Sequence, residues 1–126
     1  MLFRFKNFPV YIEAKEFRKD IRILVKTHFP HTEHCRLIDQ ILRATDSICL
    51  NIAEGSNRRT DKDFAHFLNS ALTSLEEVVS CLDLALDDGY ITIHEYKKLE
   101  IKAEALGKQL IGFQKTLRKA TYSKKS

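Results

Sequence analysis

The sequence contains little of what turn-rich, membrane-spanning or secreted proteins need. Four glycines and two prolines in 126 residues disfavour an all-β fold with many tight turns and suit long helices. No apolar run approaches the roughly 20 residues that a membrane-spanning helix requires. Residues 1–6 are too short and too charged for a secretory signal peptide, so we expect a cytoplasmic protein.

Cysteine is also scarce. Cys35, Cys49 and Cys81 are odd in number and lack the Cys-x-x-Cys spacing of metal or redox motifs. Cys49 and Cys81 fall among apolar positions of helical patterns, which predicts reduced thiols packed in a core.

Apolar residues instead recur every three or four positions in four segments, the spacing of amphipathic helices. The first segment starts near Pro9, the second covers about residues 32–57, the third lies between Thr60 and Gly89, and the fourth runs from Thr92 to about residue 119. The apolar positions of the first segment are Val10, Ala14, Phe17, Ile21 and Leu24.

Boundary signals separate these segments. Asn7 is a candidate cap for the first helix, and Pro30 ends it. Thr60 to Asp63 resembles a capping box, and Thr92 to Glu95 is a complete one. Gly89 is suited to a left-handed helix end.

Two further glycines, Gly107 and Gly112, lie inside the last helix and cost helix propensity. We expect close packing of a neighbouring helix at both.

Together these patterns predict an all-α protein, an antiparallel up-down-up-down four-helix bundle. One domain covers residues 1–119, and residues 120–126 form a frayed basic C-terminal tail. There is no βαβ alternation, no glycine-rich phosphate loop and no clear internal repeat.

Charge is strongly segregated along the chain. Residues 1–62 carry twelve Lys or Arg and eight Asp or Glu, residues 63–96 carry none and seven, and residues 97–126 carry nine and two. Such a distribution predicts opposed electrostatic faces more than a uniform basic coat.

The residues typical of catalytic and metal sites do not combine into a complete site. Three histidines and Cys35 fall within residues 28–35, but no second ligand pair follows at zinc-finger spacing, and a loop with surface histidines is the favoured interpretation. Asp63-x-x-His66 lacks the second pair and the further carboxylates of a di-iron bundle, so we interpret it as helix surface. We expect no enzyme activity, no metal and no cofactor.

A polar stripe runs beside the apolar face of the second helix. Ser47, Asn51, Glu54 and Arg58 are spaced four, three and four residues apart, so they share one side of a helix. If this stripe is buried, each group needs a partner. Arg43 and Asp46 likewise suggest an ion pair or hydrogen-bonded layer inside an assembly.

The same stretch resembles the signature of the 23S rRNA intervening-sequence (S23) proteins, a bacterial four-helix bundle family. The resemblance covers about residues 9–117, with Thr73 standing where the family often has glycine. The matching positions around the Asn-Ile-Ala-Glu-Gly core are Gln40, Arg43, Ala44, Ser47, Ile48, Asn51, Ile52, Ala53, Glu54, Gly55, Arg58, Phe64, Phe67, Leu68, Ala71, Ser74 and Glu77.

The resemblance implies a bundle that assembles into a ring, typically of five subunits. It also implies kinship with accessory proteins of diversity-generating retroelements, which bind a reverse transcriptase and nucleic acid. Within the motif we interpret six residues as structural: Arg43, Ser47, Asn51, Glu54, Gly55 and Glu77.

The function that we expect is a non-enzymatic oligomeric scaffold that binds RNA or DNA through basic side chains, beside a reverse transcriptase or ribosomal RNA. The candidate nucleic-acid-binding residues are Arg18, Lys19, Arg22, Lys26, Arg58, Arg59, Lys62, Arg118, Lys119, Lys124 and Lys125. Because no aromatic residues interleave with these charges, we expect phosphate contacts and no base stacking.

Two alternatives stay open. Arg58 pairs with Glu54 or Glu77 inside the bundle instead of contacting a ligand. The whole protein is a protein-only interaction module, whose charged faces serve subunit or partner docking.

Overall fold

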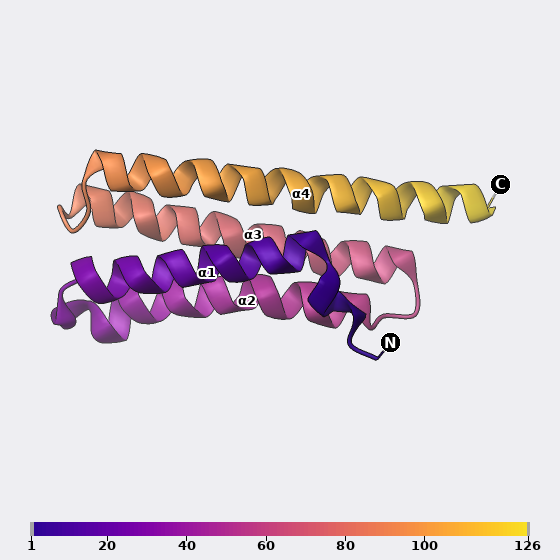
Figure 1. Cartoon of the computed structure of the whole chain (residues 1–126), viewed down its shortest axis with the longest axis horizontal. Coiled ribbons are helices and arrows are strands. Elements are labelled where there is room, and N and C mark those ends of the chain that lie inside the picture. The colour runs from indigo at the N-terminus through magenta and orange to yellow at the C-terminus, as the bar shows by residue number, and fades with distance from the viewer. Residues whose placement is uncertain (1, 126) are drawn as a thin grey trace.

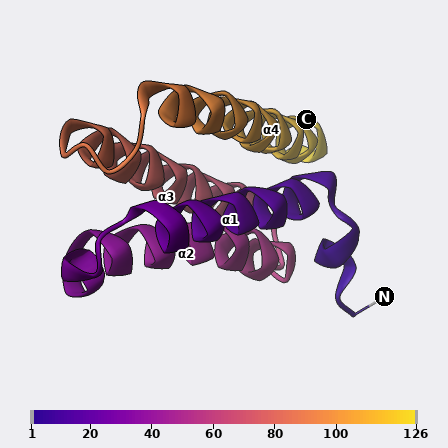
Figure 2. The ribbon, with the colours of Figure 1, turned by 60° about the vertical axis from the view of Figure 1, so that its left-hand side comes forward.

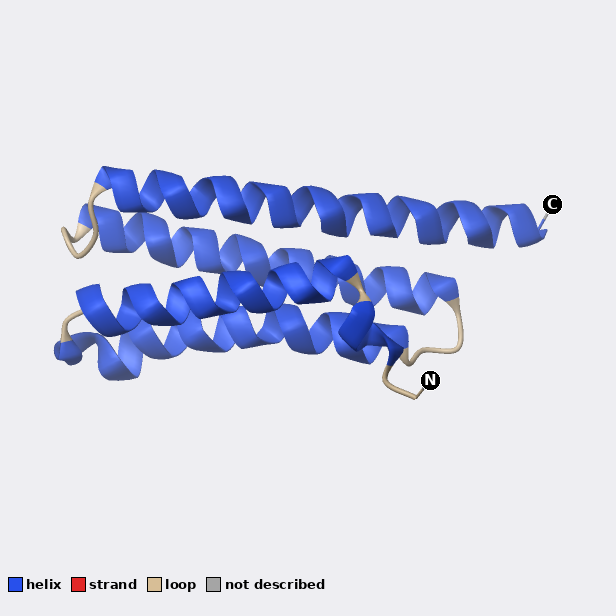
Figure 3. Ribbon diagram, in the orientation of Figure 1, coloured by secondary structure: helices blue, strands red, loops and turns tan. Residues whose placement is uncertain are grey.

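Four long helices make up most of the chain, and the part that the structure describes contains no strand (Figures 1 and 3). The computed structural model describes residues 2–125, and their side chains as far as residue 120. The helices are α1 (Pro9–His28), α2 (Asp39–Ser56), α3 (Asp61–Asp87) and α4 (Ile93–Lys125). The predicted all-α four-helix bundle is confirmed.

Successive helices run antiparallel and are joined by short corners (Figure 1). α2 packs against α1 and α3, and α4 packs against α3 and α1. α1 and α3 therefore occupy diagonally opposite corners of the bundle, an arrangement that can be followed in Figure 2.

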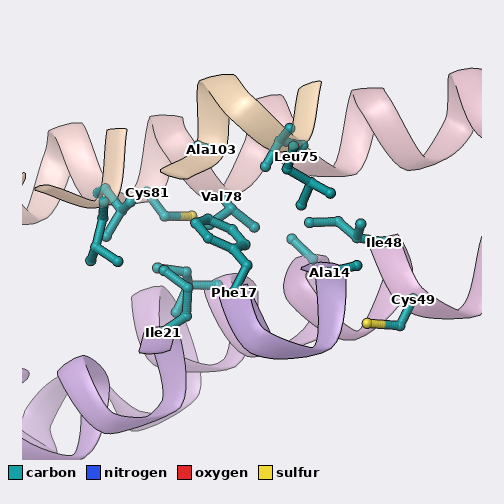
Figure 4. Close-up of a cluster of buried hydrophobic side chains, with 14 of the residues drawn as sticks. Ala14, Phe17, Ile21, Ile48, Cys49, Leu75, Val78, Cys81 and Ala103 are labelled. Carbon is teal, nitrogen blue, oxygen red and sulfur yellow. The ribbon is translucent and has the colours of Figure 1, made fainter. Parts of the chain in front are cut away.

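The apolar spacing of the sequence becomes the core. All five predicted apolar positions of α1 are buried, and Ile21 has no exposed surface. In Figure 4, Phe17 of α1 reaches across the bundle toward Val78 and Cys81 of α3. Side chains of the two diagonal helices thus meet in the centre of the bundle.

The corner between α3 and α4 forms as its sequence predicts. Gly89 has a φ of 77°, and the Tyr90 N–H donates to the Ala85 carbonyl (2.9 Å) while the Gly89 N–H donates to the Leu86 carbonyl (3.1 Å). This is the Schellman arrangement, in which a glycine takes the left-handed position.

The capping signals are also confirmed. The Glu95 N–H donates to Thr92 Oγ1 (3.1 Å), and the Thr92 N–H donates to Glu95 Oε1 (2.8 Å). At the start of α3, Thr60 Oγ1 accepts from the Asp63 N–H (3.1 Å). Both threonines satisfy a backbone donor that a helix start would otherwise leave unpaired.

Three boundaries differ from the prediction. Asn7 does not cap α1, because it belongs to a short 3-10 helix, η1 (Arg4–Asn7), and the capping position is taken by Phe8 without a side-chain hydrogen bond. The second helical segment starts with a 3-10 turn, η2 (His31–Glu33), and a π-helical turn, η3 (His34–Ile38), before α2 begins. α4 continues to Lys125, beyond the helix end predicted near residue 119.

Among the helical glycines, only Gly55 is needed for close contact. A Cβ atom at Gly55 would lie 2.8 Å from both Phe64 Cδ1 and Phe67 Cβ, closer than carbon atoms can approach. The expectation for the last helix is wrong at Gly112, where a Cβ would meet nothing within 4 Å. At Gly107 the nearest atom, Leu75 Cδ2, lies 3.5 Å away, so an alanine would fit.

Within the described residues, no helix combines the length and apolar content that crossing a lipid bilayer would demand.

Candidate nucleic-acid interface

One end of the bundle gathers positive charge from three separate parts of the chain. It contains η1, the corner between α2 and α3, and the last turns of α4 (Figure 1). We call this end the basic pole. Its exposed cations are Arg4, Lys6, Arg58, Arg59, Lys62, Lys115, Arg118 and Lys119.

A buried hydrogen bond sets the register of α4 at this pole. Gln114 Nε2 donates to the Ala65 carbonyl (3.1 Å), and the Gln114 side chain is only 4 % exposed. Because α3 and α4 are antiparallel, Arg118 lies one turn further along, level with the start of α3. The corner and the end of α4 therefore lie together, as the predicted topology required.

Aromatic packing holds the same end together. The Phe113 ring of α4 lies 5.0 Å from the Phe64 ring of α3 and 5.7 Å from the Phe8 ring before α1. Rings at these separations add specific edge-to-face contacts to the apolar area that they bury. This cluster fixes the three helix ends that carry the cations.

The N-terminal turn adds cations that sequence reasoning missed. Arg4 Nη2 donates to the Ser56 carbonyl at the end of α2 (3.2 Å), which anchors η1 beside the corner. Lys6 lies 5.9 Å from the centre of the Phe3 ring, which is 55 % exposed. An exposed aromatic ring thus lies beside a cation that was not among the predicted candidates, and the expected absence of base stacking stays a prediction.

Arg58 has partners within the chain. Its Nη2 atom lies 2.5 Å from Glu54 Oε1, and its guanidinium group lies 4.5 Å from the centre of the Phe67 ring. The pairing with Glu54 was anticipated, but it lies on the surface, since the two side chains are 40 % and 56 % exposed. The side chains of Arg59 and Lys62 are exposed and form no hydrogen bond or ion pair within the described residues, so they are the corner cations available to a ligand.

The remaining candidates on α1 lie away from the pole. Arg18, Lys19, Arg22 and Lys26 line a groove of about 960 Å³ between α1 and the start of the next helical segment. Arg18 Nε lies 2.7 Å from Asp46 Oδ1, and this hydrogen bond raises the pKa of the arginine. The structure thus divides the predicted cations whose side chains it describes into two surfaces, and the side chains of Lys124 and Lys125 lie outside the described residues.

Part of the polar stripe of α2 is joined to α3 by a chain of hydrogen bonds. Asn51 Nδ2 donates to the Ser47 carbonyl (2.8 Å) and to Ser47 Oγ (3.0 Å), and Ser47 Oγ lies 2.8 Å from Ser74 Oγ. These partly buried groups satisfy one another at the contact between the two helices.

The other members of the motif are on the surface. Arg43 pairs with Asp39 (2.8 Å), and their side chains are 78 % and 57 % exposed. Glu77 is exposed on α3, and Glu54 is exposed beside Arg58. Within one chain the polar stripe is therefore not buried at Glu54, and a role of Glu54 in assembly remains a prediction.

The histidines and cysteines that raised metal and catalytic hypotheses lie partly on the surface and partly in the core. The rings of His31 and His34 stack with centres 5.6 Å apart, and Cys35 is exposed beside them. In the described residues, no three His, Cys, Asp or Glu side chains gather in a metal-binding arrangement. Burial raises the pKa of Cys49, and it raises that of Cys81 to about 11.

Comparison with known proteins agrees with this architecture. The family model described as 23S rRNA-intervening sequence protein matches residues 6–112. A solved structure from Bacteroides thetaiotaomicron, described as a protein with unknown function from the S23 ribosomal protein family, shares 27 % sequence identity with a TM-score of 0.72. The alignment covers 84 % of this chain and 98 % of that one.

No curated protein matches the chain. The family match extends over most of the sequence and includes the whole Asn-Ile-Ala-Glu-Gly segment. This chain therefore belongs to the 23S rRNA-intervening sequence protein family.

Proposed function

We propose that this protein is a non-enzymatic, oligomeric scaffold that binds nucleic acid through its basic pole, without sequence preference. The observation that carries the proposal is the convergence of exposed cations from η1, the α2–α3 corner and α4 at one end of the bundle. Clustered Lys and Arg side chains release counterions from a nucleic acid, and this gives affinity that does not depend on sequence.

The chemistry of the pole favours phosphate contacts. Arg59 and Lys62 have no acidic partner within the described residues, so binding a phosphate breaks no ion pair. Arg58 is held against Glu54 and Phe67 and serves mainly to shape the corner. Phe3 adds one exposed ring, so a single strand gains a stacking surface that a duplex cannot use.

A titration of labelled nucleic acid at several salt concentrations tests the proposal. We compare the parent with an Arg59→Ala/Lys62→Ala variant, using one sequence as a single strand and as a duplex. The parent should bind at low salt, and the variant should bind more weakly with a salt slope smaller by about 1 to 2, since each phosphate contact contributes about 0.9 on duplex DNA.

The matched control is Lys97→Ala/Lys98→Ala. These lysines are exposed at the other end of α4, so the variant loses the same charge away from the pole. If both variants lost the same affinity for nucleic acid, binding would depend on net charge and not on the basic pole. Absence of binding by the parent at low salt would also contradict the proposal.

The second candidate function is a protein-only interaction module. The acidic stretch of residues 63–96, which contains no Lys or Arg, favours it. An assembly of this kind should persist at salt concentrations that abolish nucleic-acid binding.

Because the basic pole is proposed to bind nucleic acid without sequence preference, any sequence specificity has to come from a partner. We propose a reverse transcriptase or ribosomal RNA as the partner class, on the strength of the family alone. Pulling down the tagged protein, with and without nuclease treatment, separates a protein partner from one held through RNA.

A further inference from the structure

We propose that the basic row of α1 binds the acidic row of α3 in a second copy of this chain, in a head-to-tail contact. The inference refines the oligomeric part of the proposed function by naming the two surfaces that meet. It assigns the α1 cations to protein assembly and leaves the basic pole to nucleic acid.

The basic row lies on the side of α1 that faces away from the core. Lys15, Lys19, Arg22 and Lys26 are spaced four, three and four residues apart, and all are exposed. Ile23 lies beside them and is 55 % exposed. The row therefore combines four cations with one uncovered apolar side chain.

The groove beside this row has an apolar floor. Val25 and Phe29 are buried in it, and Ile38 and Leu42 are half-buried along its other side. A floor of this kind suits a partner with an apolar side chain and acidic neighbours.

The chain itself carries a surface of that description. On α3, Glu76, Ser80, Asp83 and Asp87 have the same four, three and four spacing and are exposed. Leu84 follows Asp83 just as Ile23 follows Arg22, and it is 52 % exposed. Each row spans twelve residues of helix, a rise of about 16 Å. Three of the four positions can therefore pair with opposite charges, since the acidic row has Ser80 at one of them.

The two rows point in different directions on one molecule. α1 and α3 stand at diagonally opposite corners of the bundle, and each row lies opposite the buried face of its helix. One copy cannot bring its own rows together. A contact between them uses a different surface on each partner, so it repeats from copy to copy until a ring closes.

Charge reversal tests this pairing. We compare the parent with Lys19→Glu/Arg22→Glu, with Asp83→Lys/Asp87→Lys, and with the chain that carries all four substitutions, by sedimentation at micromolar concentration. The parent should sediment as a closed oligomer. Each double variant should dissociate, with the dissociation constant raised at least about tenfold by like-charge contacts, and the fourfold variant should reassemble.

Controls keep the test independent of folding and of nucleic-acid binding. All four positions are exposed and point away from the core, and circular dichroism checks that each variant keeps its helix content. If a charge-reversal variant fails to fold, a neutral variant at the same positions takes its place: Lys19→Gln/Arg22→Gln or Asp83→Asn/Asp87→Asn. Lys97→Glu/Lys98→Glu carries the same charge change on α4 and should stay assembled.

Three results would overturn the pairing: a monomeric parent, a folded double variant that stays assembled, or a folded fourfold variant that stays dissociated. A Lys19→Glu/Arg22→Glu variant that remains assembled but loses nucleic-acid affinity would reassign the α1 row to nucleic acid. Whether the basic pole binds nucleic acid is tested separately, because only the Arg59→Ala/Lys62→Ala variant removes cations from the pole.

Discussion

At the scale of single residues, the α2–α3 corner depends on the absence of one side chain. Because Gly55 has no Cβ, Phe64 and Phe67 can approach the end of α2. Phe67 then lies against the guanidinium group of Arg58, 4.5 Å from its ring centre. Gly55, which we interpreted as structural from the sequence, thus sets the position of a cation at the pole.

Replacing Gly55 with alanine should destabilise the protein. Overpacking costs about 1–3 kcal/mol, which exceeds the helix propensity of up to about 1 kcal/mol that alanine adds. Gly112→Ala is the matched control, since a Cβ there meets nothing within 4 Å, and it should stabilise. Urea denaturation gives both free energies of unfolding, and two variants of equal stability would show that the corner can relax around an added methyl group.

At the scale of helices, the sequence predicts most of the bundle because its signals are local. Apolar spacing marks each buried face, and Thr92, Glu95 and Gly89 mark a corner through hydrogen bonds between near neighbours. The missed features depend on distant contacts. η1 joins the pole only because Arg4 reaches Ser56, 52 residues away, and no spacing rule contains that contact.

The candidate site was predictable to a similar degree. Antiparallel topology alone brings the corner and the end of α4 together, whereas the α1 cations fall elsewhere. The sequence does not reveal which cations are already paired. Arg18 pairs with Asp46, and Arg59 has no acidic partner among the residues that the structure describes. Both outcomes depend on how neighbouring helices are rotated.

The start of α4 should make stability depend on pH. Hydrogen bonding to the Thr92 N–H lowers the pKa of Glu95. A carboxyl group whose folded pKa is depressed adds stability above its unfolded pKa, and this stability is lost as pH falls through the folded value. His28 Nε2 also lies 2.5 Å from Glu95, so the same carboxylate links the end of α1 to the start of α4.

We therefore expect Glu95→Gln to lower the melting temperature at neutral pH. The difference from the parent should shrink below about pH 4, where an ordinary glutamate becomes protonated. Glu104→Gln, an exposed change on the same helix, is the control and should have little effect at either pH. Thermal unfolding between pH 3 and 7 measures these melting temperatures. If Glu95→Gln differed from the parent by the same amount at every pH, the Glu95 carboxylate would not be the source of the pH dependence.

At the scale of the whole molecule, the basic pole and the two charged rows point in three different directions. The basic pole lies at one end of the bundle, where η1, the α2–α3 corner and the last turns of α4 come together (Figure 1). The exposed rows of α1 and α3 follow the lengths of their helices. An assembly built through the sides leaves the end of every bundle free. Weak phosphate contacts at each pole would then add through multivalency.

The three thiols are buried to different degrees, so the order in which a reagent labels them reports the order in which the bundle opens. Cys35 is exposed, Cys49 is 7 % exposed beside α1, and Cys81 is 1 % exposed in the bundle centre (Figure 4). A thiol-specific reagent should modify Cys35 at once, Cys49 when α1 lifts away, and Cys81 only when the whole bundle unfolds. Mass spectrometry of timed samples would count these additions one by one, and simultaneous labelling of Cys49 and Cys81 would mean that α1 leaves the bundle only as the remaining helices separate.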